Sequence, residues 1–199
     1  MAKKIVWIHL FFGMIAFGIY YYRLEGPDLV WNMLLALLAL DLSLLASYVK
    51  PKILSWGSSL LWLCFYPNTF YMLTDIVHMD FTDSVLWDKT SLILYLLYVS
   101  SILFGVLCGI ESVHQMVVTF KLKNDYLRLF LLTVLAVLSS LAIHIGRYAR
   151  LNSWDIVIRP QIVFHELVNV MNWDAMHFVL GFTFIQMLCL IFLDRENTK

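Results

Sequence analysis

Side chains that could carry chemistry are concentrated in two short segments of the sequence, residues 66–79 and 144–160. The first segment reads YPNTFYMLTDIVHM and places Asp75 and His78 three residues apart, on one face if the segment is helical. An aspartate and a histidine at this spacing can bind one divalent metal ion or act as acid and base. They can equally form a hydrogen-bonded pair at a helix end, which is the commoner arrangement, so the spacing leaves both interpretations open.

A proline precedes these two residues and interrupts the segment. Pro67 removes a backbone donor and crowds the preceding turn, so we expect the helix to kink or break near Pro67–Asn68. Carbonyl groups freed at such a break need partners, and in a membrane those partners are protein groups or trapped water. Asn68 or a bound ligand could serve, although an ordinary proline kink packed against a neighbouring helix explains the pattern equally well.

The second segment, HIGRYARLNSWDIVIRP, contains three arginines, and the first two have planar guanidinium groups that suit an anionic partner. Arg147 lies in the helical part of the segment, and Arg150 follows at the turn. Arginine binds a carboxylate or a phosphate through two parallel hydrogen bonds, so both residues are candidates for binding an anionic headgroup. The structural alternative is an ion pair of either arginine with Asp75, Asp80 or Asp155.

The overall composition decides which class of protein carries these segments. The chain has 199 residues, of which 61% are hydrophobic and 14% charged, and its mean hydropathy is +0.79. A soluble domain of this composition would expose large apolar patches and aggregate, which excludes the soluble enzymes. A net charge of zero excludes a nucleic-acid binder. Three cysteines without close spacing, all in apolar runs, argue against a disulfide framework or a thiolate zinc site.

The apolar runs predict an all-α fold, an integral membrane bundle of about six transmembrane helices. A helix that crosses the hydrocarbon core needs roughly 20 apolar residues. We read residues 1–199 as a single multi-pass membrane domain whose first apolar run stays uncleaved, because Tyr20–Arg23 replace the small residues of a cleavage site. The expected spans are 5–22, 29–49, 53–73, 91–111, 126–146 and 174–193.

Charge placement predicts how the bundle is oriented. Lysine and arginine are more frequent in the segments that lie inside when the N-terminus is inside, so we expect both termini to be cytoplasmic. Two longer segments, 74–90 and 147–173, then lie outside. Within the second, residues 161–171 alternate apolar and polar types and could form a short interfacial helix. Residues 152–155, Asn-Ser-Trp-Asp, suit a helix cap or a tight turn, and Trp154 suits the interfacial aromatic belt.

Histidines on the predicted outer side could add metal ligands to the first segment. With carboxylates such as Asp155 and Asp174 nearby, they would suffice for a mixed nitrogen and oxygen site for a divalent metal. No dense motif such as HExxH is present, and scattered histidines of this kind are more often structural. The candidate ligands are Asp75, His78, His144 and His177.

One carboxylate lies within a predicted span. Asp41 is near the middle of residues 29–49, where a charge costs roughly 2.5–3.5 kcal/mol, so it should face the bundle interior and find a partner such as His9. A role in proton relay or substrate contact competes with a structural role in holding helices together through hydrogen bonds. Gly105 and Gly109 form one GxxxG spacing through which helices of two copies could associate.

The two segments together resemble a known family. YPNTFYMLTDIVHM and HIGRYARLNSWDIVIRP, with the hydropathy profile between them, resemble the bacterial membrane-protein family catalogued as domain of unknown function 1361. The resemblance covers nearly the whole chain and implies a multi-pass protein of a bacterial cell membrane, without implying an activity. The matching residues are Pro67, Asn68, Tyr71, Thr74, Asp75, His78, Gly146, Arg147, Arg150, Asn152, Ser153, Trp154, Asp155 and Pro160.

Three functions fit these residues. The first is an accessory or binding protein in which a polar pocket at the outer face binds an anionic lipid or envelope-polymer headgroup. The second is a membrane-embedded hydrolase or transferase for a lipid-linked substrate, with Asp75, His78 and Asp155 as acid and base or around a metal. The third is a small transporter that uses Asp41 and the break at Pro67. The expected ligand-binding residues are Asn68, Tyr71, Arg147, Arg150, Asn152 and Trp154.

Overall fold

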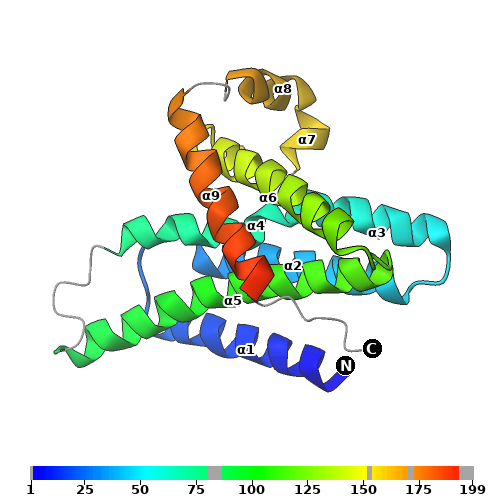
Figure 1. The fold of residues 1–199 in the computed structure, drawn as a ribbon. Coiled ribbons are helices and arrows are strands. Elements are labelled where there is room, and N and C mark those ends of the chain that lie inside the picture. The colour runs from blue at the N-terminus through cyan, green and yellow to red at the C-terminus, as the bar shows by residue number, and fades with distance from the viewer. Residues whose placement is uncertain (1, 80–86, 152–153, 170–172, 193–199) are drawn as a thin grey trace.

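A computed structural model describes residues 2–79, 87–151, 154–169 and 173–192, and every regular element among them is a helix (Figure 1). This confirms the all-α membrane bundle predicted from the apolar runs. Five helices are long and apolar enough to cross a membrane: α1 (Ala2–Tyr21), α2 (Leu29–Tyr48), α5 (Lys89–Thr119), α6 (Asp125–Tyr148) and α9 (Trp173–Phe192). We call the end of the bundle that holds residues 22–28 and 149–151 the outer end, after its predicted side.

The expected span 53–73 departs from one continuous helix. It is divided into α3 (Lys52–Phe65), α4 (Pro67–Tyr71) and the 3-10 helix η1 (Met72–His78). α3 has 14 residues and is roughly 21 Å long, less than the hydrocarbon thickness, so α3 alone does not form the sixth crossing that we expected. The predicted break at Pro67 is confirmed.

Side chains repair the backbone at this break. Asn68 Nδ2 donates a hydrogen bond to the carbonyl of Phe65 at 3.0 Å, which is the role that we considered for it. Thr69 Oγ1 donates to the carbonyl of Tyr66 at 2.7 Å. Two carbonyls beside the break thus accept side-chain hydrogen bonds from within the protein, the kind of partner that the membrane interior requires.

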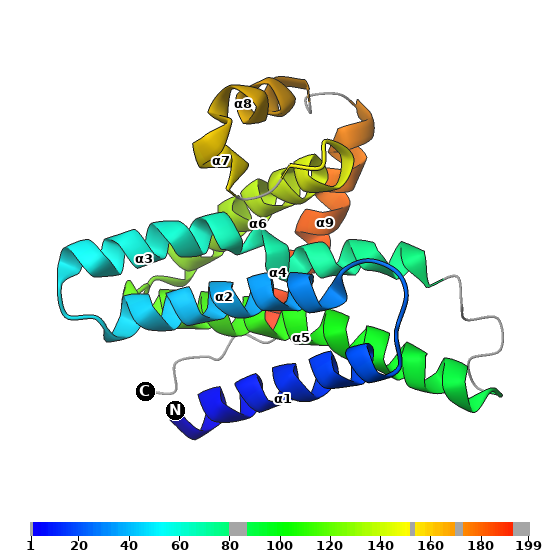
Figure 2. The same cartoon turned by 180° about the vertical axis from the view of Figure 1, so that it is seen from behind.

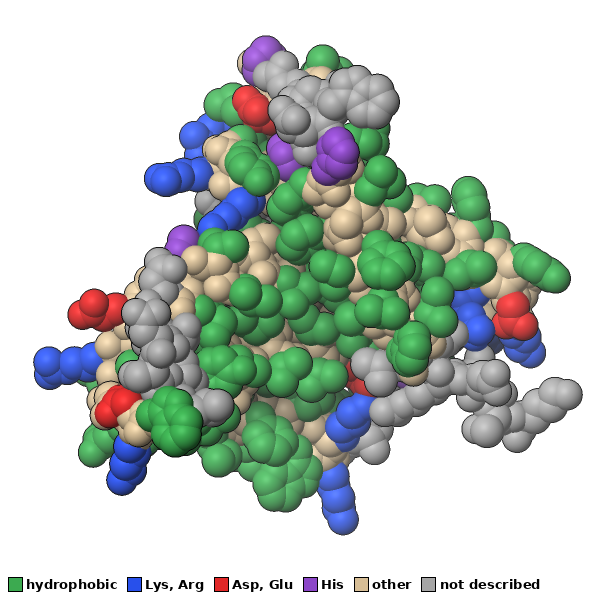
Figure 3. Space-filling view, turned by 60° about the vertical axis from the view of Figure 1, so that its left-hand side comes forward, with side chains coloured by type: hydrophobic (Ala, Val, Ile, Leu, Met, Phe, Trp, Pro, Cys, Tyr) green, Lys and Arg blue, Asp and Glu red, His purple; other side chains and the backbone are tan. Residues whose placement is uncertain are grey.

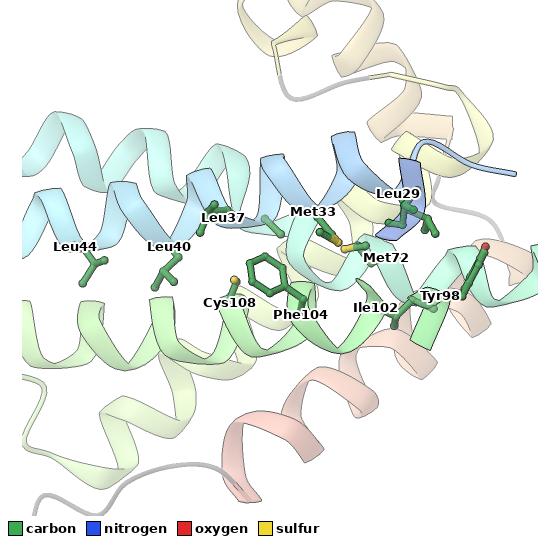
Figure 4. Packing of buried hydrophobic residues seen from close by; sticks show 12 residues of the cluster. Leu29, Met33, Leu37, Leu40, Leu44, Met72, Tyr98, Ile102, Phe104 and Cys108 are labelled. Carbon is green, nitrogen blue, oxygen red and sulfur yellow. The ribbon is translucent and has the colours of Figure 1, made fainter. Parts of the chain in front are cut away.

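The centre of the bundle is the packing of α2 against α5 and α3. Figure 4 shows Leu37 and Leu40 of α2 pointing toward Phe104 and Cys108 of α5. On α5, Gly105 and Gly109 lie directly against α4 and η1: a Cβ atom at Gly109 would stand 2.4 Å from Thr69 Oγ1. The GxxxG spacing that we considered for association of two copies is therefore occupied within the chain.

α1 lies at the edge of the bundle, where it contacts α5 and α2 (Figure 1; Figure 2). It presents an apolar stripe at helical spacing to the core (Ile5, Ile8, Phe12 and Ile15). Two polar contacts flank this stripe: Lys4 pairs with Glu111 of α5, and His9 Nε2 lies 3.3 Å from Asp41 Oδ2 of α2. Asp41 thus has the intramembrane partner that we considered for it.

The remaining helices cover the outer end. α6 packs against α9, and Gln186 of α9 donates to the Ser140 hydroxyl of α6 at 2.9 Å. Two short helices, α7 (Asp155–Ile158) and α8 (Pro160–Asn169), lie over the outer end of α6 (Figure 1; Figure 2). α8 corresponds to the interfacial helix expected over 161–171, of which residues 170 and 171 lie outside the described residues.

The surface of the bundle is apolar, as contact with lipid requires. Figure 3 shows hydrophobic side chains across the middle of one face, with charged side chains toward its edges. Large apolar side chains stand outward from several helices, among them Phe17, Leu60, Phe130 and Leu180. A surface of this kind is expected where hydrocarbon rather than water is the surrounding solvent.

Candidate functional site

A cavity of about 840 Å³ lies between α2, the broken α3–α4 segment and α6, with α8 contributing to its wall. This volume is within the range of pockets that hold small molecules and lipid headgroups. Val163 and Leu167 of α8 line it, so the interfacial helix covers part of the cavity. The two segments that the sequence singled out thus meet at one site, because the first forms one wall and the second continues from the end of another.

The polarity of the cavity changes along its length. Its inner part is lined mostly by apolar side chains, including Leu63 of α3 and Leu135 of α6. Tyr66 and Ser139 also lie there, whereas the charged and amide side chains line the outer part. At a rise of about 1.5 Å per residue, Leu135 and Arg147 lie roughly 18 Å apart along α6. A space with a cationic mouth and an apolar interior fits an elongated amphiphile. The polar lining at the outer part is Asn32, Asn68, Tyr71, His78, Arg147 and Arg150.

Behind this mouth lies Asp75, whose side chain is 1% exposed. Asn32 Nδ2 donates to its carboxylate at 2.9 Å, and the Tyr98 hydroxyl donates to its backbone carbonyl at 2.6 Å. Asp75 lies past the end of α4, outside the membrane-crossing helices, and burial raises the pKa of its carboxyl. The hydrogen bond from Asn32 and the charge of Arg147 act in the opposite direction. Asp75 is therefore placed to orient other residues, since it has no path to solvent.

Arg147 is held by two partners on η1. Its Nη2 donates to Nε2 of His78 at 2.9 Å, and its Nη1 lies 3.9 Å from Asp75 Oδ1. Because guanidinium only donates, Nε2 of His78 must accept, which assigns the imidazole proton to Nδ1. Arg147 therefore enters the cavity with its orientation already fixed, a preorganised cation at the mouth.

Arg150 is the second cation at the mouth and differs from the first. It is exposed, its φ of 54° places it in the left-handed region just after α6 ends, and it lines the cavity. Among the described residues it forms no ion pair or hydrogen bond. A cation beside a cavity and without a partner in the described chain is free to bind an anion from outside.

The structure separates other predicted site residues from the cavity. Asp155 is 1% exposed; it accepts a hydrogen bond from Arg159 Nε at 3.0 Å and forms an ion pair with Arg159 Nη2 at 2.8 Å. Pairing of Asp155 with Arg147 or Arg150 was one alternative that we considered, but the ion pair is with Arg159, one helical turn away. Trp154 makes an edge-to-face contact with Trp31. Trp31 lines the cavity, whereas Trp154 does not. Asn152 lies outside the described residues.

The candidate metal ligands are dispersed in the described part of the chain. His144 packs against Tyr148 and Phe178, away from the cavity lining, and His177 is exposed on α9. The described residues contain no group of three or more His, Cys, Asp or Glu side chains able to hold one ion. The metal-dependent hydrolase or transferase stays a prediction.

The family model described as "Protein of unknown function (DUF1361)" matches residues 31–189. The chain belongs to this family. The match spans every residue that lines the cavity, from Trp31 to Leu167, whereas α1 lies before it. Searches of curated proteins and of solved structures gave no match.

Several residues of this DUF1361 chain that matter to the site were missed in the sequence. Asn32 had a visible signal, as the single amide in a largely apolar span, which in a membrane needs a partner. Tyr66 and Ser139 line the cavity but have no signal in sequence, because tyrosine and serine are common in membrane helices. Arg159 lies within the second segment, but we considered only Arg147 and Arg150 there as ion-pair partners.

Proposed function

We propose that the protein binds an amphiphile with an anionic headgroup in this cavity, as an accessory or binding protein of a bacterial cell membrane. Support comes from one arrangement above all: two arginines at the outer mouth of a cavity whose inner part is apolar. Arg147 is oriented by Asp75 and His78, and Arg150 keeps its guanidinium available. A phosphate or carboxylate headgroup would bind there, while the hydrocarbon of the same molecule would lie against Leu63 and Leu135.

The chain supplies a matched pair of arginines to test this proposal. Arg150 and Arg23 are both exposed arginines with a left-handed backbone, at φ values of 54° and 50°, but only Arg150 lines the cavity. We expect Arg150→Gln to weaken binding of dioleoyl phosphatidate about 10- to 100-fold, since a hydrogen bond to a charged group is lost. Arg23→Gln should leave it unchanged.

Affinity would be measured by native mass spectrometry of the detergent-purified protein, with dioleoyl phosphatidylcholine as the neutral-headgroup comparison. Equal binding of both lipids by the wild-type protein would contradict the proposal. So would equal losses of affinity in the Arg150 and Arg23 variants, because the cavity would then play no special part.

The proposal includes an orientation with both termini in the cytoplasm, which places the mouth of the cavity at the outer leaflet. The excess of lysine and arginine at the inner end of the bundle supports it. A C-terminal alkaline phosphatase fusion, active only outside the cytoplasm, should be inactive, and a fusion after Leu151 should be active. The reverse pattern would invert the proposed topology.

A further inference from the structure

Two hydroxyl groups deep in the cavity lack hydrogen-bond partners. The Tyr66 Oη and the Ser139 Oγ have no hydrogen-bond partner in the part of the chain that the structure describes. Both residues are buried, with exposures of 0% and 2%. Both residues line the same cavity, Tyr66 at the α3–α4 junction and Ser139 on α6. Buried polar groups are almost always satisfied, so two exceptions in one cavity call for an explanation.

Two further buried atoms of the described residues are unpaired, His144 Nδ1 and Gln186 Oε1, but neither residue lines the cavity. Other serine hydroxyls on these helices are bonded. Ser140, the next residue along α6, donates to the Ala136 carbonyl at 2.8 Å and accepts from Gln186. Ser59 on α3 donates to the Ser55 carbonyl at 2.8 Å. A serine in a helix usually bonds to a carbonyl one turn back in this way. The Ser139 hydroxyl makes no such bond and is left for whatever fills the cavity.

The position of the two hydroxyls is informative about the ligand. Ser139 lies roughly 12 Å below Arg147 along α6, so the hydroxyls lie beneath the cationic mouth and among apolar side chains such as Leu138. The part of a ligand that extends inward from the arginines would therefore lie beside the two hydroxyls. If the ligand carried only hydrocarbon there, both hydroxyls would remain unsatisfied in an apolar surrounding, which is costly.

We infer that the ligand is an acyl-ester lipid, whose linkage carbonyls accept hydrogen bonds from Tyr66 and Ser139 while its anionic group binds at Arg150. A diacyl lipid has two ester carbonyls, so each hydroxyl can donate to one of them. This inference rests on the proposed function and narrows it, because it favours glycerolipids over polyprenyl phosphates, which carry only hydrocarbon beneath the phosphate. The hydroxyls act as a selectivity element for the region between headgroup and chains.

The test compares lipids that differ only at the linkage. Probes are dioleoyl phosphatidate, its dioleyl-ether analogue and geranylgeranyl phosphate, each titrated into the detergent-purified full chain and followed by native mass spectrometry. The wild-type protein should bind the diester about tenfold more tightly than the diether, as expected from a pair of neutral hydrogen bonds, and geranylgeranyl phosphate should bind no better than the diether.

Variants assign the preference to the two hydroxyls. Tyr66→Phe with Ser139→Ala should bind the diester as weakly as the diether, and each single change should lose part of the difference. Ser59→Ala, which removes a hydroxyl bonded within α3 and outside the cavity lining, should keep the full preference. If the double variant does not fold, as judged by its gel-filtration profile, the two single variants carry the test.

The outcomes separate this inference from the proposed function. If the probes bind with dependence on Arg150 but diester and diether bind equally, the inference is overturned and water satisfies the hydroxyls. A preference that survives in the double variant overturns it as well. If no probe binds the wild-type protein, or Arg150→Gln has no effect, the proposed function itself has failed.

Discussion

Arg147 and His78 are 69 residues apart in sequence and are joined by a hydrogen bond of 2.9 Å from Nη2 to Nε2. This bond ties α6 to η1 at the mouth of the cavity. It also occupies the imidazole nitrogen that projects farthest from the backbone, so any other partner of that nitrogen must first displace Arg147. Asp75 and His78 thus serve to hold the guanidinium of Arg147 in place.

Replacing Arg147 by lysine should destabilise the protein, because an ammonium cannot reach Asp75 and His78 together in the geometry of the planar guanidinium. We expect Arg147→Lys to lower the free energy of unfolding by about 1–3 kcal/mol, since Asp75 is buried and loses its cationic neighbour. Thermal unfolding in detergent measures the change. Arg150→Lys is the control and should unfold like the wild-type protein; equal destabilisation by both would refute the role given to Arg147.

Asn32 and Asp75 should be energetically coupled. Asn32→Leu removes the donor that lies 2.9 Å from the buried carboxylate, which should cost about 2 kcal/mol. In an Asp75→Asn background the same change should cost less, because a neutral amide suffers less from losing a donor. A double-mutant cycle on unfolding measures the coupling, and strictly additive effects would show that the bond contributes nothing of its own.

His9 and Asp41 should tolerate joint replacement better than single replacement. His9 Nδ1 lies 2.9 Å from the Ile5 carbonyl and its Nε2 lies 3.3 Å from Asp41 Oδ2, so this side chain joins α1 to α2. His9→Leu leaves Asp41 without this partner inside the membrane and should cost about 2–3 kcal/mol.

Replacing both residues by leucine should recover most of this loss, because no unpaired polar group then remains at this partly exposed contact, where the two side chains are 44% and 42% exposed. Thermal unfolding of the two single variants and the double variant, each in the same detergent, provides the comparison. A double variant less stable than either single one would show that the pair does more than fasten α1.

The metal-dependent alternative is tested by elemental mass spectrometry of protein purified without chelators. We expect the same metal content in the wild-type protein and in Asp75→Ala/His78→Ala, since the described residues bring no third ligand to these two and Arg147 occupies His78 Nε2. Near-stoichiometric zinc, manganese or iron in the wild type that is lost in the variant would instead favour the hydrolase or transferase.

Local and long-range features of this fold differ in how well sequence predicts them. Apolar runs and Pro67 act on their own neighbours, so the helices and the break could be predicted residue by residue. That the third crossing would be divided into three pieces could not, because this depends on α4 docking on Gly105 and Gly109 of a distant helix.

The site shows the same limit. Its two segments could be recognised because their polar residues are out of place in an apolar chain. Asn32 and Asp75 are 43 residues apart, and nothing in either local pattern says that they meet. The partner of Asp155 was predictable from local geometry, because Arg159 lies one helical turn away on the same side of the chain. Arg147 lies farther away in sequence and was the weaker candidate for this ion pair.

The walls of the cavity are distributed along most of the chain, from Trp31 on α2 to Leu167 on α8. Because the ribosome synthesises the helices in this order, α2 can enter the membrane before α8 has been made. Until α6 and α8 have followed, the inner faces of α2 and α3 are open to bulk lipid. The finished cavity thus closes around a space that lipid already occupies, which would allow the protein to acquire its ligand during its own biogenesis.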